Sequence, residues 1–216
     1  MWQQGTGSYR DLTWGSGIFA AVSSDGHTGL TSADGITWTD RQVGMTKELR
    51  SIAYGNGLWF AVGQTGRIAY CTSLNPWQSN YYSGVSDFRF IQFVRDRFFL
   101  ATANSLLWVT NASTVHVITG VPSAPSINSL AYGNGRYVGV GDYGSVIVST
   151  NGTDWAETQV DTSPPGDADN IKRAFQAIVF VNGYFVAAGP PGRLFVSTDA
   201  AIQTVGRGCV NPRRND

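Results

Sequence analysis

Apolar and polar positions alternate in short runs along this chain, and one such run returns five times. Each copy alternates like a half-buried strand and ends in an aromatic residue. The copies are Tyr9–Trp14, Leu49–Tyr54, Phe88–Phe93, Ile127–Tyr132 and Phe175–Phe180. By subtraction, their final aromatics lie 40, 39, 39 and 48 residues apart. This period predicts a repeat protein that is built from short strands.

Three further strands are expected after each run. In the second copy the turn Gly55–Gly57 comes first, and its Asn-Gly pair predicts a tight hairpin because both residues tolerate a positive φ. The expected strands that follow are Leu58–Gly63, Arg67–Thr72 and Trp77–Tyr81. Four strands in each period near 40 residues are typical of a β-propeller blade. The fold expected is therefore all-β, a five-bladed β-propeller of four-stranded antiparallel blades.

The turn before the fourth strand carries a second recurring motif. It runs from Ser32 to Trp38 in the first copy and from Ser149 to Trp155 in the fourth. We expect a serine or asparagine side chain to bond the hairpin backbone, the glycine to take a positive φ, and the tryptophan to fold back as a hydrophobic plug. The third copy lacks the glycine turn, and Asp96 is expected to supply the turn there.

The two ends of the chain predict how the ring closes. The last copy has Gln203 where the tryptophan is expected, whereas Met1–Gln4 matches Pro76–Ser79. We therefore expect Trp2, Gln3 and Gln4 to form the missing outer strand of the fifth blade, beside Gly192–Thr198. This N-terminal strand would close the ring and cover an open sheet edge.

Composition narrows the class of protein. The chain has 216 residues, a net charge of zero and only 14% charged residues. We expect a single propeller domain over residues 1–205 and a polar C-terminal tail over 206–216. The zero net charge argues against nucleic acid as a partner and against an electrostatic membrane anchor. No apolar run is long enough for membrane insertion, and Met1–Gly5 does not resemble a signal peptide.

Few residues suggest catalysis or metal binding. His27 and His116 have no neighbouring ligand cluster, so we expect no metal and no cofactor. Glu48 and Glu157 are the only glutamates, and neither lies in a pattern typical of a glycosidase. We expect no catalytic residue and no enzyme. Whether the two cysteines, Cys71 and Cys209, form a disulfide stays open.

Five polar residues recur at one position of the first strands. They are Arg10, Arg50, Arg89, Asn128 and Gln176. Equivalent positions in a closed ring share a radius, so we expect these side chains to converge at the channel mouth. The arginines can hold a carboxylate, a phosphate or an acidic loop; alternatively, all five bond the backbone and loops of neighbouring blades. Tyr82, Tyr143 and the insertion 161–172 add surface on the same face, suited to a sugar ring or a protein partner.

These turns and hairpins together resemble the sialidase-like, Asp-box repeat family and the photosystem II assembly factor propellers. The resemblance covers residues 9–203 and is greatest for the short, glycine-rich versions of bacteria and phage tail genes. It implies the propeller fold, and it implies a basic patch around the recurring arginines.

The resemblance and the low charge lead to an expectation about function. We expect a non-enzymatic structural or host-adhesion component of a bacteriophage virion, associated with a tail or fibre. It would be made in the host cytoplasm, dock on tail or capsid proteins, and have a host surface glycan as a further ligand. The alternative is a cellular carbohydrate-binding (lectin-like) or assembly-factor propeller.

Overall fold

The structure is a computed structural model, and it describes most of the chain. The described residues are 8–24, 28–42, 47–110, 116–118, 126–159, 174–189, 193–199 and 203–204. The chain divides into two compact units, residues 1–127 and 128–216, and each unit is taken by itself below.

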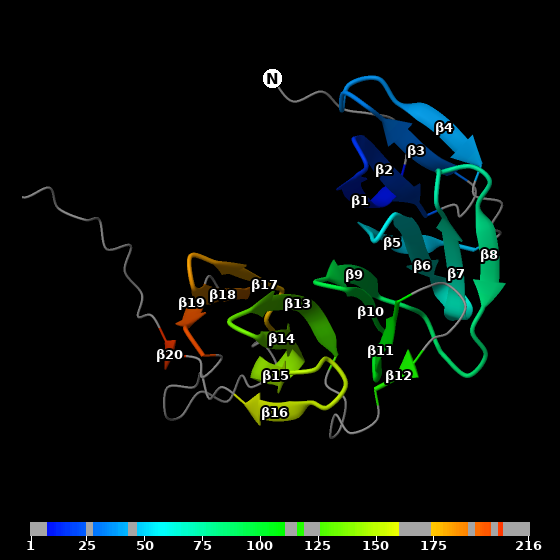
Figure 1. Ribbon diagram of the computed structural model, residues 1–216. Coiled ribbons are helices and arrows are strands. Elements are labelled where there is room, and N and C mark those ends of the chain that lie inside the picture. Colours follow the sequence, from blue (N-terminus) through cyan, green and yellow to red (C-terminus); the bar gives the residue numbers. More distant parts are fainter. Residues whose placement is uncertain are drawn as a thin grey trace, which may run out of the picture. The chain divides into compact units, whose positions relative to one another are not determined.

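The first unit holds three four-stranded antiparallel sheets, in each of which the strands follow one another in sequence order (Figure 1). The first sheet consists of β1 (Tyr9–Gly15), β2 (Ile18–Ser23), β3 (Thr28–Ser32) and β4 (Thr39–Gln42). The second consists of β5 (Leu49–Gly55), β6 (Leu58–Gly63), β7 (Arg67–Cys71) and β8 (Gln78–Tyr81). The third consists of β9 (Phe90–Val94), β10 (Arg97–Ala101), β11 (Leu106–Val109) and β12 (His116–Val117).

The second unit holds two sheets of the same kind. The fourth sheet consists of β13 (Ile127–Gly133), β14 (Arg136–Gly141), β15 (Ser145–Ser149) and β16 (Ala156–Gln159). The fifth consists of β17 (Ala177–Val181), β18 (Tyr184–Gly189), β19 (Arg193–Ser197) and β20 (Gln203–Thr204). Single 3-10 turns, η1 (Gln64–Gly66) and η2 (Asp142–Gly144), precede β7 and β15. The expected all-β fold and four-stranded antiparallel sheets are confirmed.

The first hairpin of every sheet turns on two residues, and the leading one has a positive φ. In three of the sheets this residue is an asparagine: Asn56, Asn134 and Asn182 have φ values of 50°, 47° and 51° respectively. In the third sheet this conformation falls on Arg95, with a φ of 62°, and Asp96 is the second residue of the turn. The hairpin forms without glycine because Arg95 itself takes the left-handed conformation that the turn requires.

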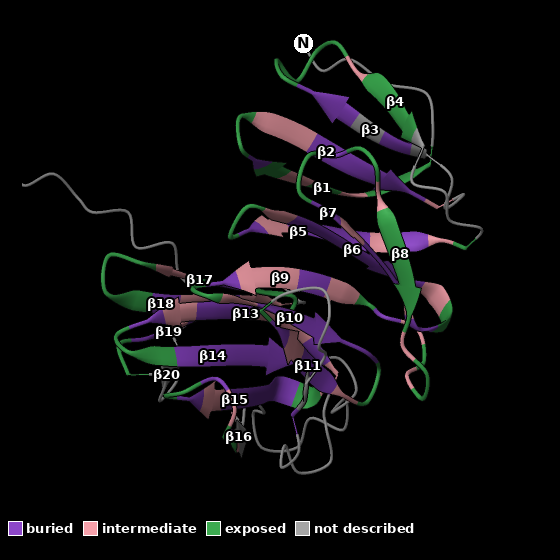
Figure 2. Ribbon diagram, turned by 45° about the vertical axis from the view of Figure 1, so that its right-hand side comes forward, coloured by how far each residue is buried: buried purple, intermediate pink, exposed green. Residues whose placement is uncertain are grey.

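Apolar side chains fill the space between neighbouring sheets within each unit. Val22 packs with Ile52 and Trp59 between the first and second sheets. Further clusters join the second sheet to the third and the fourth sheet to the fifth. Most strands therefore bury both faces, whereas the outer strands β4 and β8 are largely exposed (Figure 2).

The outer edge of β19 is paired with β20. Phe195 lies opposite Thr204, and Val196 lies opposite Gln203. The sequence predicts the N-terminal strand at this edge, but residues 1–7 lie outside the described residues. Closure by that strand therefore stays a prediction, and the chain itself supplies a fourth strand here.

Candidate functional site

The recurring polar position lies on a β-bulge in the first two sheets. The register of β1 on β2 shifts between Tyr9 and Asp11, so Arg10 is the extra residue. In the second sheet the shift falls between Leu49 and Ser51, around Arg50. A bulge re-aims the side chain that it carries, which separates this position from the simple alternation of the strand.

Glu48 joins the first two arginines. Its carboxylate lies 2.6 Å from Arg10 Nε and 3.3 Å from Arg50 Nε. Gln64 Nε2 donates to the same carboxylate at 2.8 Å. The Glu48 side chain is only 11% exposed, against 55% for Arg10 and 29% for Arg50. A carboxylate this deeply placed requires such donors, because an unpaired buried charge is costly.

The other members of the set also bond neighbouring segments. Arg50 Nη2 lies 3.0 Å from Asp87 Oδ2, just before the third sheet. Arg89 Nη1 donates to the hydroxyl of Ser126. In the second unit, Asn128 Nδ2 donates to the Phe175 carbonyl at 2.8 Å, just before the fifth sheet.

These contacts favour the structural alternative for Arg10, Arg50, Arg89 and Asn128. Their donors already serve protein acceptors that lie on or before another sheet. Gln176 is exposed, and no partner for its side chain lies among the described residues. The convergence of all five positions on one channel mouth involves both units and stays a prediction.

Sequence reasoning missed the two acidic partners, Glu48 and Asp87. Each stands two residues before a recurring arginine, Arg50 and Arg89 respectively. This fixed spacing was a usable signal, because an acid at one repeat position can meet the base of another repeat. The sequence pattern shows no pairing for Glu48, whereas in the structure its carboxylate bonds Arg10 and Arg50.

A second set of side chains links the first strands of neighbouring sheets. Asp11 Oδ2 accepts hydrogen bonds from Ser51 Oγ at 2.6 Å and from the Ile52 N–H at 2.9 Å. In the second unit, Ser129 Oγ accepts from the Ile178 N–H at 3.3 Å. The same repeat position thus receives a donor from the next sheet in both units.

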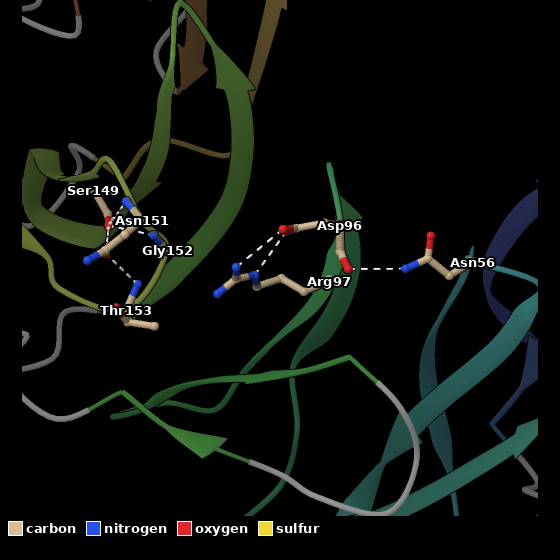
Figure 3. A network of polar contacts seen from close by, with 7 residues as sticks. All are labelled: Asn56, Asp96, Arg97, Ser149, Asn151, Gly152 and Thr153. Atoms are coloured by element: carbon tan, nitrogen blue, oxygen red, sulfur yellow. Dashed lines mark hydrogen bonds and ion pairs between the residues drawn. The ribbon is translucent and has the colours of Figure 1, made fainter.

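The hairpin asparagines make the corresponding link at the turns. Asn56 Nδ2 donates to the Asp96 carbonyl at 3.1 Å, beside the Asp96–Arg97 ion pair (Figure 3). Asn134 Nδ2 donates to the Gly183 carbonyl at 3.2 Å. Asp96 and Gly183 occupy the same place in their turns, so the two bonds are equivalent.

Steric interlocking adds to these polar links. A Cβ placed on Gly15, Gly55 or Gly133 would overlap an aromatic ring of the following sheet. The rings belong to Tyr54, Phe93 and Phe180 respectively. Because it has no side chain, the glycine that ends the first strand of these sheets leaves room for the aromatic ring from the first strand of the following sheet.

The motif before the fourth strand has the local geometry that the sequence predicts. In the fourth sheet, Ser149 Oγ accepts from the Gly152 N–H at 2.8 Å, and Asn151 Oδ1 accepts from the Thr153 N–H at 2.9 Å (Figure 3). Asp34 replaces the asparagine in the first sheet. Hydrogen bonds from the Thr37 and Ile36 N–H groups lower the pKa of Asp34 from 3.8 to about 2.

The remaining candidates are dispersed. Tyr143 is largely exposed in η2, whereas Tyr82 is half-buried against the core between the second and third sheets. The insertion 161–172 lies outside the described residues. Cys71 is buried, and burial raises the pKa of its thiol to about 11. Cys209 lies outside the described residues, so whether the two cysteines pair stays open.

Within the described ranges, no cluster of three or more His, Cys, Asp or Glu residues has the geometry to hold a metal ion. Searching the same ranges for a helix of sufficient length and apolar character to cross a membrane also finds none.

No family model matches the sequence, and no curated protein matches it either. Solved structures do match in fold. One is YCF48 bound to a D1 peptide, with 14% identity and a TM-score of 0.64 over 89% of this chain and 63% of that chain. The virginiamycin B lyase from Staphylococcus aureus matches with 14% identity and a TM-score of 0.74, over 90% of this chain and 68% of that chain.

The WD40 β-propeller domain of Doa1 matches with 12% identity and a TM-score of 0.67, over 94% of this chain and 69% of that chain. This chain thus spans about two thirds of the length of these structures, and less than two thirds of the YCF48 chain. One of them is named as an enzyme and the others are not. At such low identity the likeness concerns the fold alone, and that fold is the β-propeller.

Proposed function

We propose that this chain is a non-enzymatic β-propeller that acts by docking on other proteins, as a structural or host-adhesion component of a phage-like virion. One observation carries the docking role: large apolar side chains such as Ile36, Tyr81 and Tyr143 are exposed on hairpins and outer strands. Exposed apolar surface of this kind is typical of protein contact sites. Arg10 and Arg50, by contrast, already pair with Glu48 and Asp87.

Purified phage particles provide the test of the virion role. Particles purified on a density gradient should contain the chain in a fixed ratio to the tail or capsid proteins, measured by quantitative mass spectrometry. Native mass spectrometry of a mild particle dissociation should then give a complex with the docking protein. A chain that is found only in the cytoplasm of uninfected cells would contradict this role.

A peptide-binding assembly factor is the second candidate. The likeness to YCF48 bound to a D1 peptide supports it, and that likeness concerns the fold. This role requires a complex with a partly assembled cellular protein, which native mass spectrometry of cell extracts would detect. A lectin role, including contact with a host glycan, predicts saturable binding on a glycan array.

The closed five-bladed ring with its N-terminal strand remains the arrangement that the sequence predicts. Deleting residues 1–5 tests it. If Trp2 is buried in the outer strand, the deletion removes a large aromatic from a core and costs roughly 3–5 kcal/mol. An unchanged melting temperature would contradict closure by this strand.

A further inference from the structure

The outer strand of the second sheet has an edge with which no other described strand pairs. β8 forms a ladder with β7 on one side only, and all four of its residues are exposed (Figure 2). Both faces of this sheet are covered by the first and third sheets of the same unit. Closure of a ring would join other sheets by their faces, so it would leave this edge unused.

The register of β8 on β7 decides which backbone groups point outwards. The Tyr82 N–H donates to the Gly66 carbonyl at 2.9 Å, so these two residues form a hydrogen-bonded pair. Such pairs alternate along an antiparallel ladder, and Asn80 therefore also bonds β7. The residues between them, Ser79 and Tyr81, turn their N–H and C=O groups away from β7.

Only one of these outward groups is covered. The Tyr81 N–H donates to the side-chain oxygen of Asn80, Oδ1, at 2.7 Å. The Tyr81 carbonyl and both backbone groups of Ser79 have no hydrogen-bond partner among the residues that the structure describes. Unpaired N–H and C=O groups on a strand edge are a template for pairing with another strand.

The edge of β8 carries no charge that would keep another strand away. Residues 72–86 contain no Asp, Glu, Lys or Arg, whereas β4 carries Asp40 and Arg41, and β16 carries Glu157. Charged side chains are a common means of preventing edge-to-edge pairing. A two-fold axis brings each side chain close to its own copy, so an uncharged strand is the one suited to meet itself.

We propose that β8 pairs antiparallel with β8 of a second copy of this chain, about a two-fold axis between the two Asn80 residues. Ser79 of each copy lies opposite Tyr81 of the other, and each such pair exchanges both of its backbone hydrogen bonds. The two Asn80 amides lie opposite each other and bond one another, which releases the Tyr81 N–H for the new ladder.

The side chains suit this register. Ser79 and Tyr81 share one side of the strand, so a small serine of one copy meets a large aromatic ring of the other. The Tyr81 ring is 51% exposed, and the Arg67 guanidinium lies 5.5 Å from its centroid, on the neighbouring strand of its own sheet. The contact is isologous, so it closes at two copies, and its small area makes the association weak and dependent on concentration.

The residue on the two-fold axis gives the sharpest test. Asn80→Asp keeps a side-chain oxygen that can accept from the Tyr81 N–H, so the single chain should fold normally. In the dimer it places two carboxylates directly opposite each other. Sedimentation equilibrium of the purified full chain should show dimers of the wild type at rising concentration, and at least about fivefold weaker association of Asn80→Asp.

A mixture of two variants tests the register itself. Asn80→Lys alone should also associate weakly, because it opposes two ammonium groups. An equimolar mixture of Asn80→Asp and Asn80→Lys should restore one-to-one dimers, because opposite charges then face each other across the axis. Asn104→Asp is the matched control, since Asn104 is exposed and lies between β10 and β11; it should associate like the wild type.

Ser79→Pro tests the backbone contact. Proline lacks the N–H that Ser79 points outwards, and the bonds to β7 do not use that group, so the sheet should persist while the dimer is lost. A wild type that stays monomeric at all concentrations overturns the proposal, and so does a mixture of the Asn80 variants that associates no better than either alone. The proposal does not rest on the virion role, because these readouts need only the purified chain, whereas that role is tested on particles.

Discussion

At the scale of single residues, one side-chain oxygen or carboxylate often accepts several hydrogen bonds. Asp34 and Asn151 do the same work in two hairpins, where one side-chain oxygen accepts two backbone N–H groups. The carboxylate differs from the amide because it can be protonated. Glu48 shows the complementary case, in which one carboxylate serves two arginines and a glutamine.

The hairpin of the first sheet should weaken in acid. The pKa of Asp34 is lowered to about 2 in the folded state, below its usual 3.8. Its contribution to stability is therefore complete well above pH 4 and is lost as the pH falls from about 4 toward 2. Asp34→Asn should remove this part of the pH dependence and keep the hairpin, as Asn151 does. Carboxyl NMR titration measures the pKa, and an ordinary value would contradict the two backbone bonds.

Arg50→Ala should destabilise the first unit. The change leaves Glu48 and Asp87 each short of a donor, and we expect a loss of about 1–3 kcal/mol in the free energy of unfolding. Thermal melting measures it, with Arg136→Ala as the control, since Arg136 is exposed and has no ion pair within the described ranges. Normal melting combined with the loss of a docking partner would instead assign Arg50 to a ligand site.

Strands and hairpins were the part of the fold that the sequence predicted well. The alternation in Leu49–Tyr54 and the glycine turn after it are local signals, and β5 and β6 form where they indicate. The bulges at Arg10 and Arg50 were not predictable in this way, because they depend on the register between two strands. The Glu48 pairs depend on packing between repeats, which alternation within one strand does not encode.

Gly55→Ala should reveal the interlock between neighbouring sheets. The new methyl group would overlap the Phe93 ring, and we expect a loss of about 1–3 kcal/mol. Gly57→Ala is the control: its φ of +74° is unfavourable for alanine, but no atom lies within 4 Å of the added carbon. Its cost should be about 1 kcal/mol. Urea unfolding compares the two variants, and an equal or smaller loss for Gly55→Ala would contradict the interlock.

At the scale of the whole molecule, we expect charge to have little influence on docking. The chain has no net charge, and the proposed docking role rests on exposed apolar side chains. An arginine-based dock on an acidic partner would behave differently, because screened charges lose attraction as salt is added.

Docking on a partner protein should therefore change by no more than about twofold between low and moderately high sodium chloride. Sedimentation equilibrium at several ionic strengths measures this. A steep loss of association with salt would indicate that the exposed arginines, Arg10 first among them, make the contact instead.

Within each unit, the asparagine bonds and the glycine–aromatic contacts point in one direction along the chain, from a sheet to the one that follows it. A junction of this kind does not limit the number of sheets, because each sheet contacts only its immediate neighbours. A gene that duplicates or loses one whole period near 40 residues would leave the chemistry of every surviving junction unchanged. Related genes can then differ in their number of repeats, and therefore of sheets, while each sheet keeps the same fold.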